Sequence, residues 1–275
     1  MILIDISQIA IANIMVSSSS LKNELNDNLI KHMIITSLLE LKLKFGHEFG
    51  DMVICADGRQ NWRKNIFPHY KAARHKEKDN NFIDWENLYK AIESFKLDLK
   101  INFPYKVIEL HDAEADDIIA VLSKNAKEPT LIVSSDKDFK QLHQYKNVKQ
   151  YCPRKKSMIN VSNPSKELLE LVIRGDVSDG VPNIRSDGDT FVDKAKRQLP
   201  MTVKHFENFM KEIPKELQEN YERNDRLINF KNIPINIQQR ILEEYNKPAL
   251  GNKQKIYQYF MNNRMKNLLQ NVGKF

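Results

Sequence analysis

Short hydrophobic runs alternate with longer helix-like stretches along the first two-thirds of the chain. The runs contain few polar residues, a pattern typical of strands covered on both faces, and they lie at residues 2–5, 52–57, 105–109, 130–134 and 148–152. The helix-like stretches lie at residues 26–45, 84–100 and 113–125. Strands that alternate with helices predict right-handed crossovers, and hence an α/β fold with a mostly parallel central sheet flanked by helices.

The pattern becomes helical after residue 163. Asn163 can cap a helix, and Pro164 suits the first helical position. The buried face of this helix is predicted to consist of Leu168, Leu169, Leu171, Val172 and Ile173. Helical periodicity returns, without a convincing strand, at 202–211, 234–246 and 252–270. We therefore predict an α/β domain at residues 1–163 and an all-helical region at residues 164–275.

Composition narrows the class of protein. The chain has 275 residues and a net charge of +7, which favours an anionic partner such as nucleic acid. Its 2 cysteines, Cys55 and Cys152, provide neither a disulfide framework nor a metal-binding cluster, which fits a reducing cytosol. The charged Asp5 comes too early for a signal peptide, and no apolar run approaches the ~18 residues of a membrane span. We expect a cytoplasmic protein with no membrane partner.

Acidic residues follow the predicted strands with unusual regularity. The carboxyl ends of parallel strands meet at one edge of a sheet, so these acids are expected to gather there. They are Asp5, Asp57, Glu114, Asp116, Asp117, Asp136 and Asp138, with Asp176 and Asp179 after a later helix. Carboxylates so crowded raise one another's pKa unless cations are present, and oxygen-only ligands favour Mg²⁺ or Mn²⁺ over zinc. A single such acid is more often structural, and Asp112 is interpreted as the N-cap of the following helix.

The acids at positions 136 and 138 form the sharpest pattern. In an extended segment, side chains two residues apart project to the same side, so Asp136 and Asp138 are predicted to face one pocket while Lys137 points away. In a regular helix over 113–125, Glu114 would share a face with Asp117 rather than with Asp116.

Residues 59–78 combine positive charge with aromatic side chains. The basic residues are Arg59, Arg63, Lys64, Lys71, Arg74, Lys76 and Lys78, and the aromatic residues are Trp62, Phe67 and Tyr70. Cations contact phosphates and aromatic faces accept unstacked bases, which favours substrate handling beside the acidic edge. The alternative is a solvated segment whose aromatic side chains pack inward. A second basic segment, 151–160, is predicted to form an exposed hairpin.

Four motifs resemble the flap endonuclease and 5′-nuclease superfamily. They are R-x₄-P-x-YK-x₂-R at 63–74, E-A-D-D at 114–117, D-K-D-F-x-Q-L at 136–142 and G-D-V-S-D-G at 175–180. All four occur in the family's order. Further stretches at 147–150, 184–187 and 255–260 are similar to the bacteriophage branch of this superfamily.

The resemblance implies a PIN-like 5′-nuclease fold with a helical arch at about 59–84. It implies a 5′→3′ exonuclease and flap endonuclease, with ribonuclease H-type activity on RNA–DNA hybrids, that removes RNA primers and 5′ flaps during DNA replication. Two Mg²⁺ ions would serve as cofactors, and Mn²⁺ could substitute. A replication clamp and a single-stranded-DNA-binding protein are family-level partners, a monomer is expected, and a phage-encoded protein would act in the host cytoplasm.

The family's site residues carry over by position. The first metal would be held by Asp5, Asp57, Glu114, Asp116 and Asp136, and the second by Asp138 and Asp179 with Asp176 nearby. The resemblance places Asp116 ahead of Asp117, which stays in the candidate set. Lys71 and Arg63 match cations that contact the phosphate, and Tyr70 matches an aromatic residue that contacts a terminal base. Further nucleic-acid contacts are expected from Lys64, Arg74, Arg154, Lys155 and Lys156.

The chain departs from the family after residue 180. The helix-hairpin-helix glycines are mostly missing from 181–192, so we expect no K⁺ site there and assign duplex binding to the hairpin and to the C-terminal helices. Residues 252–263 loosely resemble a clamp-docking peptide. Their Ile256, Tyr257 and Phe260 are instead predicted to belong to the core.

Two other functions remain as alternatives. A non-catalytic, structure-specific nucleic-acid-binding protein would be expected to have lost some of the acids, and none is missing. A phosphatase of the haloacid-dehalogenase type needs a second acid two residues after the aspartate of its first strand. This chain has Asp5-Ile6-Ser7 at that position.

Overall fold

A six-stranded, mostly parallel sheet forms the centre of the protein. The structure is a computed structural model that describes residues 1–17, 27–72 and 85–275. The strands are β1 (Ile2–Asp5), β2 (Met52–Ala56), β3 (Lys106–Glu109), β4 (Thr130–Val133), β5 (Val148–Cys152) and β6 (Ser157–Ile159). Their spatial order is β3-β2-β1-β4-β5-β6, and only the last pair is antiparallel. The fold class and all five predicted strands are confirmed.

The helices of the N-terminal part are α1 (Ile6–Ser17), α2 (Asp27–Phe49), α3 (Arg63–Ile66), α5 (Trp85–Asn102) and α6 (Ala115–Asn125), followed by the 3₁₀ helix η1 (Asp138–Gln144). Helices α1, α2 and α5 pack on one face of the sheet and α6 packs on the other. The three predicted helices correspond to α2, α5 and α6. Helix α1 was not predicted because its sequence is apolar on most sides and shows no helical periodicity.

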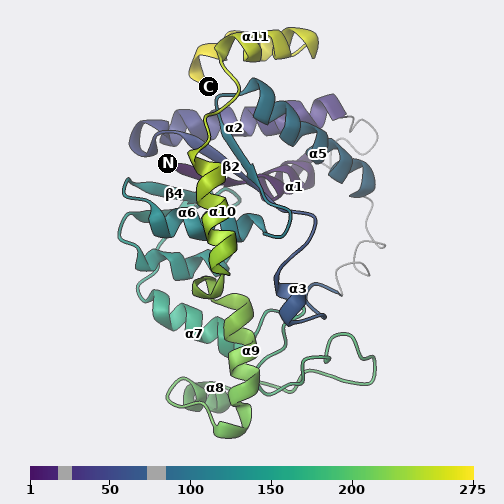
Figure 1. The fold of residues 1–275 in the computed structure, drawn as a ribbon, viewed down its shortest axis with the longest axis vertical. Helices are drawn as coiled ribbons and strands as arrows, with labels where there is room; N and C mark the ends of the chain where they lie inside the picture. The colour runs from purple at the N-terminus through teal and green to yellow at the C-terminus, as the bar shows by residue number, and fades with distance from the viewer. Residues whose placement is uncertain (18–26, 73–84) are drawn as a thin grey trace.

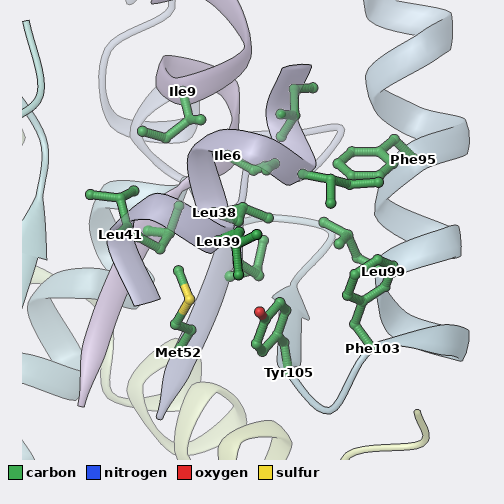
Figure 2. Packing of buried hydrophobic residues seen from close by; sticks show 14 of the residues in the cluster. Ile6, Ile9, Leu38, Leu39, Leu41, Met52, Phe95, Leu99, Phe103 and Tyr105 are labelled. Carbon is green, nitrogen blue, oxygen red and sulfur yellow. The ribbon is translucent and has the colours of Figure 1, made fainter. Parts of the chain in front are cut away.

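Alternate residues of the five parallel strands β1 to β5 pack into two separate cores. Ile2 and Ile4 of β1 face α1, α2 and α5, whereas Leu3 faces α6 and α10. Figure 2 shows the first core, where Phe95 and Leu99 of α5 point toward Leu38 of α2. A sheet covered on both faces requires the continuous apolar strands seen in the sequence.

The chain beyond residue 163 is helical, as predicted. It forms α7 (Pro164–Arg174), η2 (Val177–Asp179), α8 (Val203–Phe209), η3 (Lys215–Leu217), α9 (Gln218–Ile228), η4 (Phe230–Asn232), α10 (Ile235–Asn246), α11 (Lys253–Asn262), α12 (Lys266–Leu269) and η5 (Val272–Lys274). The side chain of Asn163 caps α7 by accepting from the Lys166 amide at 2.9 Å. Residues 181–202 contain turns but no helix.

The C-terminal helices return along the molecule to complete both cores. Helices α8, α9, α10 and α11 follow one another along its long axis (Figure 1). Ile237 and Ile241 of α10 join the core on the α6 side, and Ile256 and Phe260 of α11 join the other. The predicted division at residue 163 thus separates two regions that share hydrophobic cores. Tyr257 was wrongly predicted to be buried and is half-exposed, whereas its neighbour Tyr259 is buried.

Two local predictions have opposite outcomes. Segment 151–160 forms the predicted hairpin, in which Cys152 of β5 pairs with Ser157 of β6 across an exposed basic turn. Asp112 is not the N-cap of α6, because the cap is Glu114, and Asp112 instead accepts two hydrogen bonds from Arg240 at 2.8 and 2.9 Å. Among the described residues, the helices are all too short or too polar to span a bilayer.

Candidate metal centre

The carboxyl edge of the central strands carries the predicted acids. Asp5 ends β1, Asp57 follows β2 and Asp136 lies three residues after β4, and β1 pairs in parallel with both neighbours. Asp5 also caps the first turn of α1 by accepting from the Gln8 amide at 3.0 Å. Asp57 accepts from the Ala115 amide at 2.9 Å, which holds the start of α6 against this edge.

The side chains of Glu114, Asp116 and Asp117, at the start of α6, point in different directions. Glu114 is the N-cap and forms a capping box with Asp117. Asp117 is fully buried, and its carboxylate accepts from Trp62 Nε1 and from two guanidinium nitrogens of Arg63, at 3.0, 3.0 and 2.8 Å. Asp116 faces the other way and is under the influence of the Asp5 and Asp136 charges. Asp117 therefore has no free oxygen for a metal, contrary to its place in the predicted ligand set.

The segment after β4 is a turn rather than an extended strand. The amide of Asp138 donates to Asp136 Oδ1 at 2.9 Å, and η1 starts at residue 138. Asp138 lines the acidic pocket and Asp136 lies directly beside it, so the predicted extended geometry is wrong, while the pocket shared by both carboxylates stays a prediction. Lys137 does not point away, because the turn directs it across to Asp176, where its Nζ lies 2.8 Å from Oδ2.

The acids after α7 complete the pocket. Asp176 caps η2 by accepting from the Ser178 amide at 2.8 Å. Asp179 Oδ2 accepts from the Tyr70 hydroxyl at 2.6 Å and lies 3.6 Å from Lys71 Nζ. The pocket is lined by Arg63, Tyr70, Glu114, Asp116, Asp138, Asp176 and Asp179, together with Val181, Leu227, Ile228 and Phe230.

Burial, together with crowding, raises the pKa of four carboxyl groups at this edge. Burial, followed by the charges of Asp57 and Asp136, raises the pKa of Asp5 to about 7. Burial and neighbouring carboxylates also raise the pKa values of Asp116, Asp136 and Asp138. Divalent cations would remove this penalty, because they favour the ionised carboxylates.

The donor set fits a hard divalent cation. Oδ1 of Asp138 is buried and has no hydrogen-bond partner among the described residues, so it is an acceptor that lacks a positive group. Within the described part of the chain, no three His, Cys, Asp or Glu side chains converge closely enough to bind one ion directly. Carboxylate oxygens are the ligands that hard divalent cations take in proteins, and such ions can also bind through coordinated water.

Lys71 holds the opposite side of the pocket. Its Nζ forms a short ion pair with Glu114 Oε1, and its amide donates to the Asp179 carbonyl at 2.7 Å. Burial favours the protonated form of Glu114, but the charges of Lys71 and Arg63 outweigh it and lower the pKa of Glu114 to about 2. Glu114 is therefore ionised, and its two oxygens are paired with Lys71, Arg63 and Tyr70.

Arg63 and Tyr70 are buried where sequence reasoning expected contact with substrate. Arg63 is 2% exposed, and besides Asp117 it binds Glu114 and donates from Nε to the Leu227 carbonyl at 2.8 Å. The Tyr70 ring is also buried, and its hydroxyl donates to Glu114 or Asp179. With Trp62 and Phe67 buried as well, the alternative in which the aromatic side chains pack inward is the correct one.

The predicted nucleic-acid-binding residues fall into two groups. Lys64, Arg154, Lys155 and Lys156 are exposed. Arg74 and the second part of the predicted arch, residues 73–84, lie outside the described residues.

Sequence reasoning missed Gln141, which ties the acidic loop to the C-terminal helices. Its side-chain amide donates to the Asp138 carbonyl at 3.0 Å and to the Ile228 carbonyl at 3.1 Å, and its carbonyl accepts from the Phe230 amide at 3.0 Å. The signal was its fixed place three residues after Asp138 in the D-K-D-F-x-Q-L motif.

The fold and the comparisons with known families together define a 5′–3′ exonuclease. Residues 1–168 match the family described as 5′-3′ exonuclease, N-terminal resolvase-like domain, and residues 162–275 match the family described as T4 RNase H, C terminal. The ribonuclease H of Enterobacteria phage T4 is 31% identical over 291 residues, which cover 99% of this chain and 95% of the relative. The chain belongs to the 5′–3′ exonuclease family.

Solved structures share the fold at low sequence identity. The T5 5′-exonuclease with bound zinc ions has a TM-score of 0.63 at 13% identity, covering 90% of this chain and 99% of its own. The bacteriophage T5 flap endonuclease in complex with DNA and metal ions has a TM-score of 0.62 at the same identity and coverage. The predicted family, fold and class of enzyme are confirmed.

Proposed function

We propose that the protein is a 5′→3′ exonuclease and flap endonuclease that removes RNA primers and 5′ flaps during DNA replication, with two Mg²⁺ ions as cofactors and Mn²⁺ as a substitute. The observation that carries this proposal is the pair of features at the carboxyl edge: four acids with raised pKa, and a buried oxygen of Asp138 that lacks a hydrogen-bond partner among the described residues.

The acids divide between two metal subsites. Asp5, Asp57, Glu114, Asp116 and Asp136 would hold the first ion, and Asp138, Asp176 and Asp179 the second. When bound, such ions lower the pKa of water and neutralise charge on phosphate oxygens. Asp117 is left out of both sets, because all its hydrogen-bonding capacity serves Arg63, Trp62 and the Glu114 amide.

Lys71 and Arg63 have different tasks in this proposal. Lys71 is 17% exposed at the pocket, so its ammonium group can stabilise negative charge on a phosphate that enters. Arg63 is a positioning residue, since its guanidinium is committed to Asp117, Glu114 and the Leu227 carbonyl. Tyr70 orients Glu114 and Asp179 through its hydroxyl instead of contacting a base.

Exposed cations provide the surface for the nucleic acid. The basic turn of the hairpin follows β5, which is parallel to β4, so Arg154, Lys155 and Lys156 emerge at the same edge as Asp136. Lys64 lies on α3, next to the pocket residue Arg63. These residues would contact phosphates of DNA or of RNA–DNA hybrids without reading sequence.

The proposal extends to the setting in which the enzyme acts. We expect a monomer that acts in the cytoplasm, that of the host if the protein is phage-encoded, with a replication clamp and a single-stranded-DNA-binding protein as partners.

Cleavage of a 5′-labelled flap and of a nicked RNA–DNA duplex, in Mg²⁺ or in EDTA, tests the function. We expect cleavage by the wild type in Mg²⁺ only, and none by Asp136→Asn. Binding without cleavage by the wild type would favour the non-catalytic alternative. Cleavage in EDTA, or unchanged cleavage by Asp136→Asn, would exclude the proposed chemistry.

A further inference from the structure

Lys137 lies between two candidate metal ligands but pairs with a third acid from another part of the chain. Its Nζ is 2.8 Å from Asp176 Oδ2, which joins the loop after β4 to the loop before η2. The Lys137 side chain is 50% exposed, whereas that of Asp176 is 7% exposed. The ammonium group therefore reaches from the surface into the acidic pocket.

The other oxygen of Asp176 is already committed to its own turn. Oδ1 accepts from the Ser178 amide at 2.8 Å, from the Ser178 hydroxyl at 2.6 Å and from the Asp179 amide at 3.3 Å. Only Oδ2 remains to face a cation. In the part of the chain that the structure describes, Lys137 is the cation paired with it.

Lys137 carries a single positive charge, which cannot neutralise all the carboxylates around it. The carboxylates of Asp176, Asp138 and Asp136 all act on Lys137. Of these, Asp138 retains the buried oxygen for which the described residues offer no hydrogen-bond donor. A divalent ion placed between Asp138 and Asp176 would satisfy that oxygen, but it would meet Oδ2 of Asp176 already paired with Lys137.

The two lysines that pair with acids of the pocket, Lys71 and Lys137, differ in how strongly they are held. Lys71 is 17% exposed and is held by Glu114, by Asp179 and through its backbone amide. The Lys137 side chain is half-exposed and forms this one ion pair among the described residues, so water can solvate its ammonium group when it leaves Asp176. Lys137 is therefore the exchangeable cation.

We propose that Lys137 is a resident counter-cation of this site: its ammonium group holds Asp176 in the metal-free protein and is displaced from Oδ2 when a divalent ion binds between Asp138 and Asp176. The inference rests on the proposed metal centre and adds a positioning residue to it. Asp138 and Asp176 come from different regions of the chain. The ion pair between Lys137 and Asp176 therefore holds the two regions together before the metal binds. Ion binding must break that pair, which weakens the apparent affinity.

Replacing Lys137 separates its effect on the stability of the metal-free protein from its effect on the affinity for the ion. We compare wild type, Lys137→Met and Lys137→Arg, with Lys140→Met as the matched control. Lys140 lies in η1, three residues after Lys137, and its Nζ is 2.8 Å from Glu167 Oε2, away from the pocket. Binding of Ca²⁺ or Mn²⁺ is measured by titration calorimetry, and thermal unfolding is measured in EDTA. We expect Lys137→Met to bind the ion about two- to fivefold more tightly than wild type and to melt at a lower temperature in EDTA. Lys137→Arg should restore both values, and Lys140→Met should bind the ion as wild type does.

The outcomes separate this inference from the nuclease proposal. If wild type binds the ion and cleaves DNA while Lys137→Met binds it equally or more weakly, the exchange is overturned and the nuclease proposal stands. If Lys137→Arg behaves like Lys137→Met, the exchange is likewise overturned, because the charge would not be what matters. If wild type neither binds an ion nor cleaves, both proposals are overturned.

Discussion

Asp117 and Arg63 form a two-oxygen ion pair inside the protein, with contacts of 2.8 and 3.0 Å. Asp117 follows the candidate metal ligand Asp116 in the first turn of α6, and Arg63 lies in α3 at the base of the predicted arch. Through the Leu227 carbonyl, Arg63 also holds the end of α9. These two contacts of Arg63 therefore join the acidic pocket, the base of the predicted arch and the C-terminal helices.

Asp117→Asn should destabilise the protein strongly. Removing one partner of a buried pair leaves the other charge uncompensated, at a cost of about 3–5 kcal/mol. Urea unfolding monitored by circular dichroism measures the loss, and titration calorimetry should show an unchanged number of bound ions. Full stability combined with a lost ion would place Asp117 among the metal ligands instead.

Lys71→Met should reduce the rate of cleavage rather than the binding of substrate. Loss of one preorganised cation at the reacting phosphate typically lowers kcat by about 10²–10³. Single-turnover kinetics on a 5′ flap measures the step. Lys64→Met provides the contrast, because exposed Lys64 is expected to affect the dissociation constant and to leave the single-turnover rate intact. A lower single-turnover rate for Lys64→Met, together with weaker substrate binding alone for Lys71→Met, would contradict these assignments.

Stabilisation by Mg²⁺ should grow with pH. The pKa of Asp5 is 3.8 in its ordinary environment and about 7 in the folded protein. Between these values the folded protein retains a proton that the unfolded chain has released, so this group's contribution to the stability of the metal-free protein falls as pH rises from about 4 to about 7. Asp116, Asp136 and Asp138 act in the same direction.

A divalent ion binds the ionised carboxylates and competes with these protons. The increase in melting temperature from EDTA to saturating Mg²⁺ should therefore be larger at about pH 8 than at about pH 5.5. Equal increases at both pH values would show that these acids do not take part in binding the ion.

The basic turn should contribute to DNA affinity through phosphate contacts. Replacing Arg154, Lys155 and Lys156 by Gln should weaken DNA binding and make the log–log slope of affinity against salt less steep by about 2–3. Fluorescence anisotropy at several salt concentrations measures both. The matched control replaces exposed Lys124, Lys127 and Lys146, which lie before β4 and β5 at the opposite edge of the sheet. Equal effects of the two triple variants would argue against a specific role for the turn.

Hydrophobic patterning predicted the sheet well because its strands are buried on both faces. It missed α1, whose apolar residues surround the helix, and α9, whose sequence is mostly polar and buries only Asn224, Leu227 and Ile228. The acids at strand ends could be predicted, since parallel strands bring their carboxyl ends to one edge.

The partners of those acids could not be predicted from sequence spacing. Lys137 reaches Asp176, and Arg63 reaches Leu227, over distances along the chain that only tertiary packing determines. The aromatic residues near Lys71 were misread for a related reason. Interleaved charge and aromatic rings suit an exposed surface for bases, but here α9 and the loop after η2 cover Phe67 and Tyr70.

Asp116→Asn tests the metal centre most directly. Asp116 is buried with a raised pKa, so its ionised form is under strain without a cation, and the amide should raise the melting temperature in EDTA. The decisive measurement is Mg²⁺-dependent cleavage of a 5′-labelled flap by this variant beside wild type. We expect a more stable protein that no longer cleaves. Cleavage at the wild-type rate by a folded Asp116→Asn protein would contradict the assignment of this edge as the metal-dependent nuclease centre.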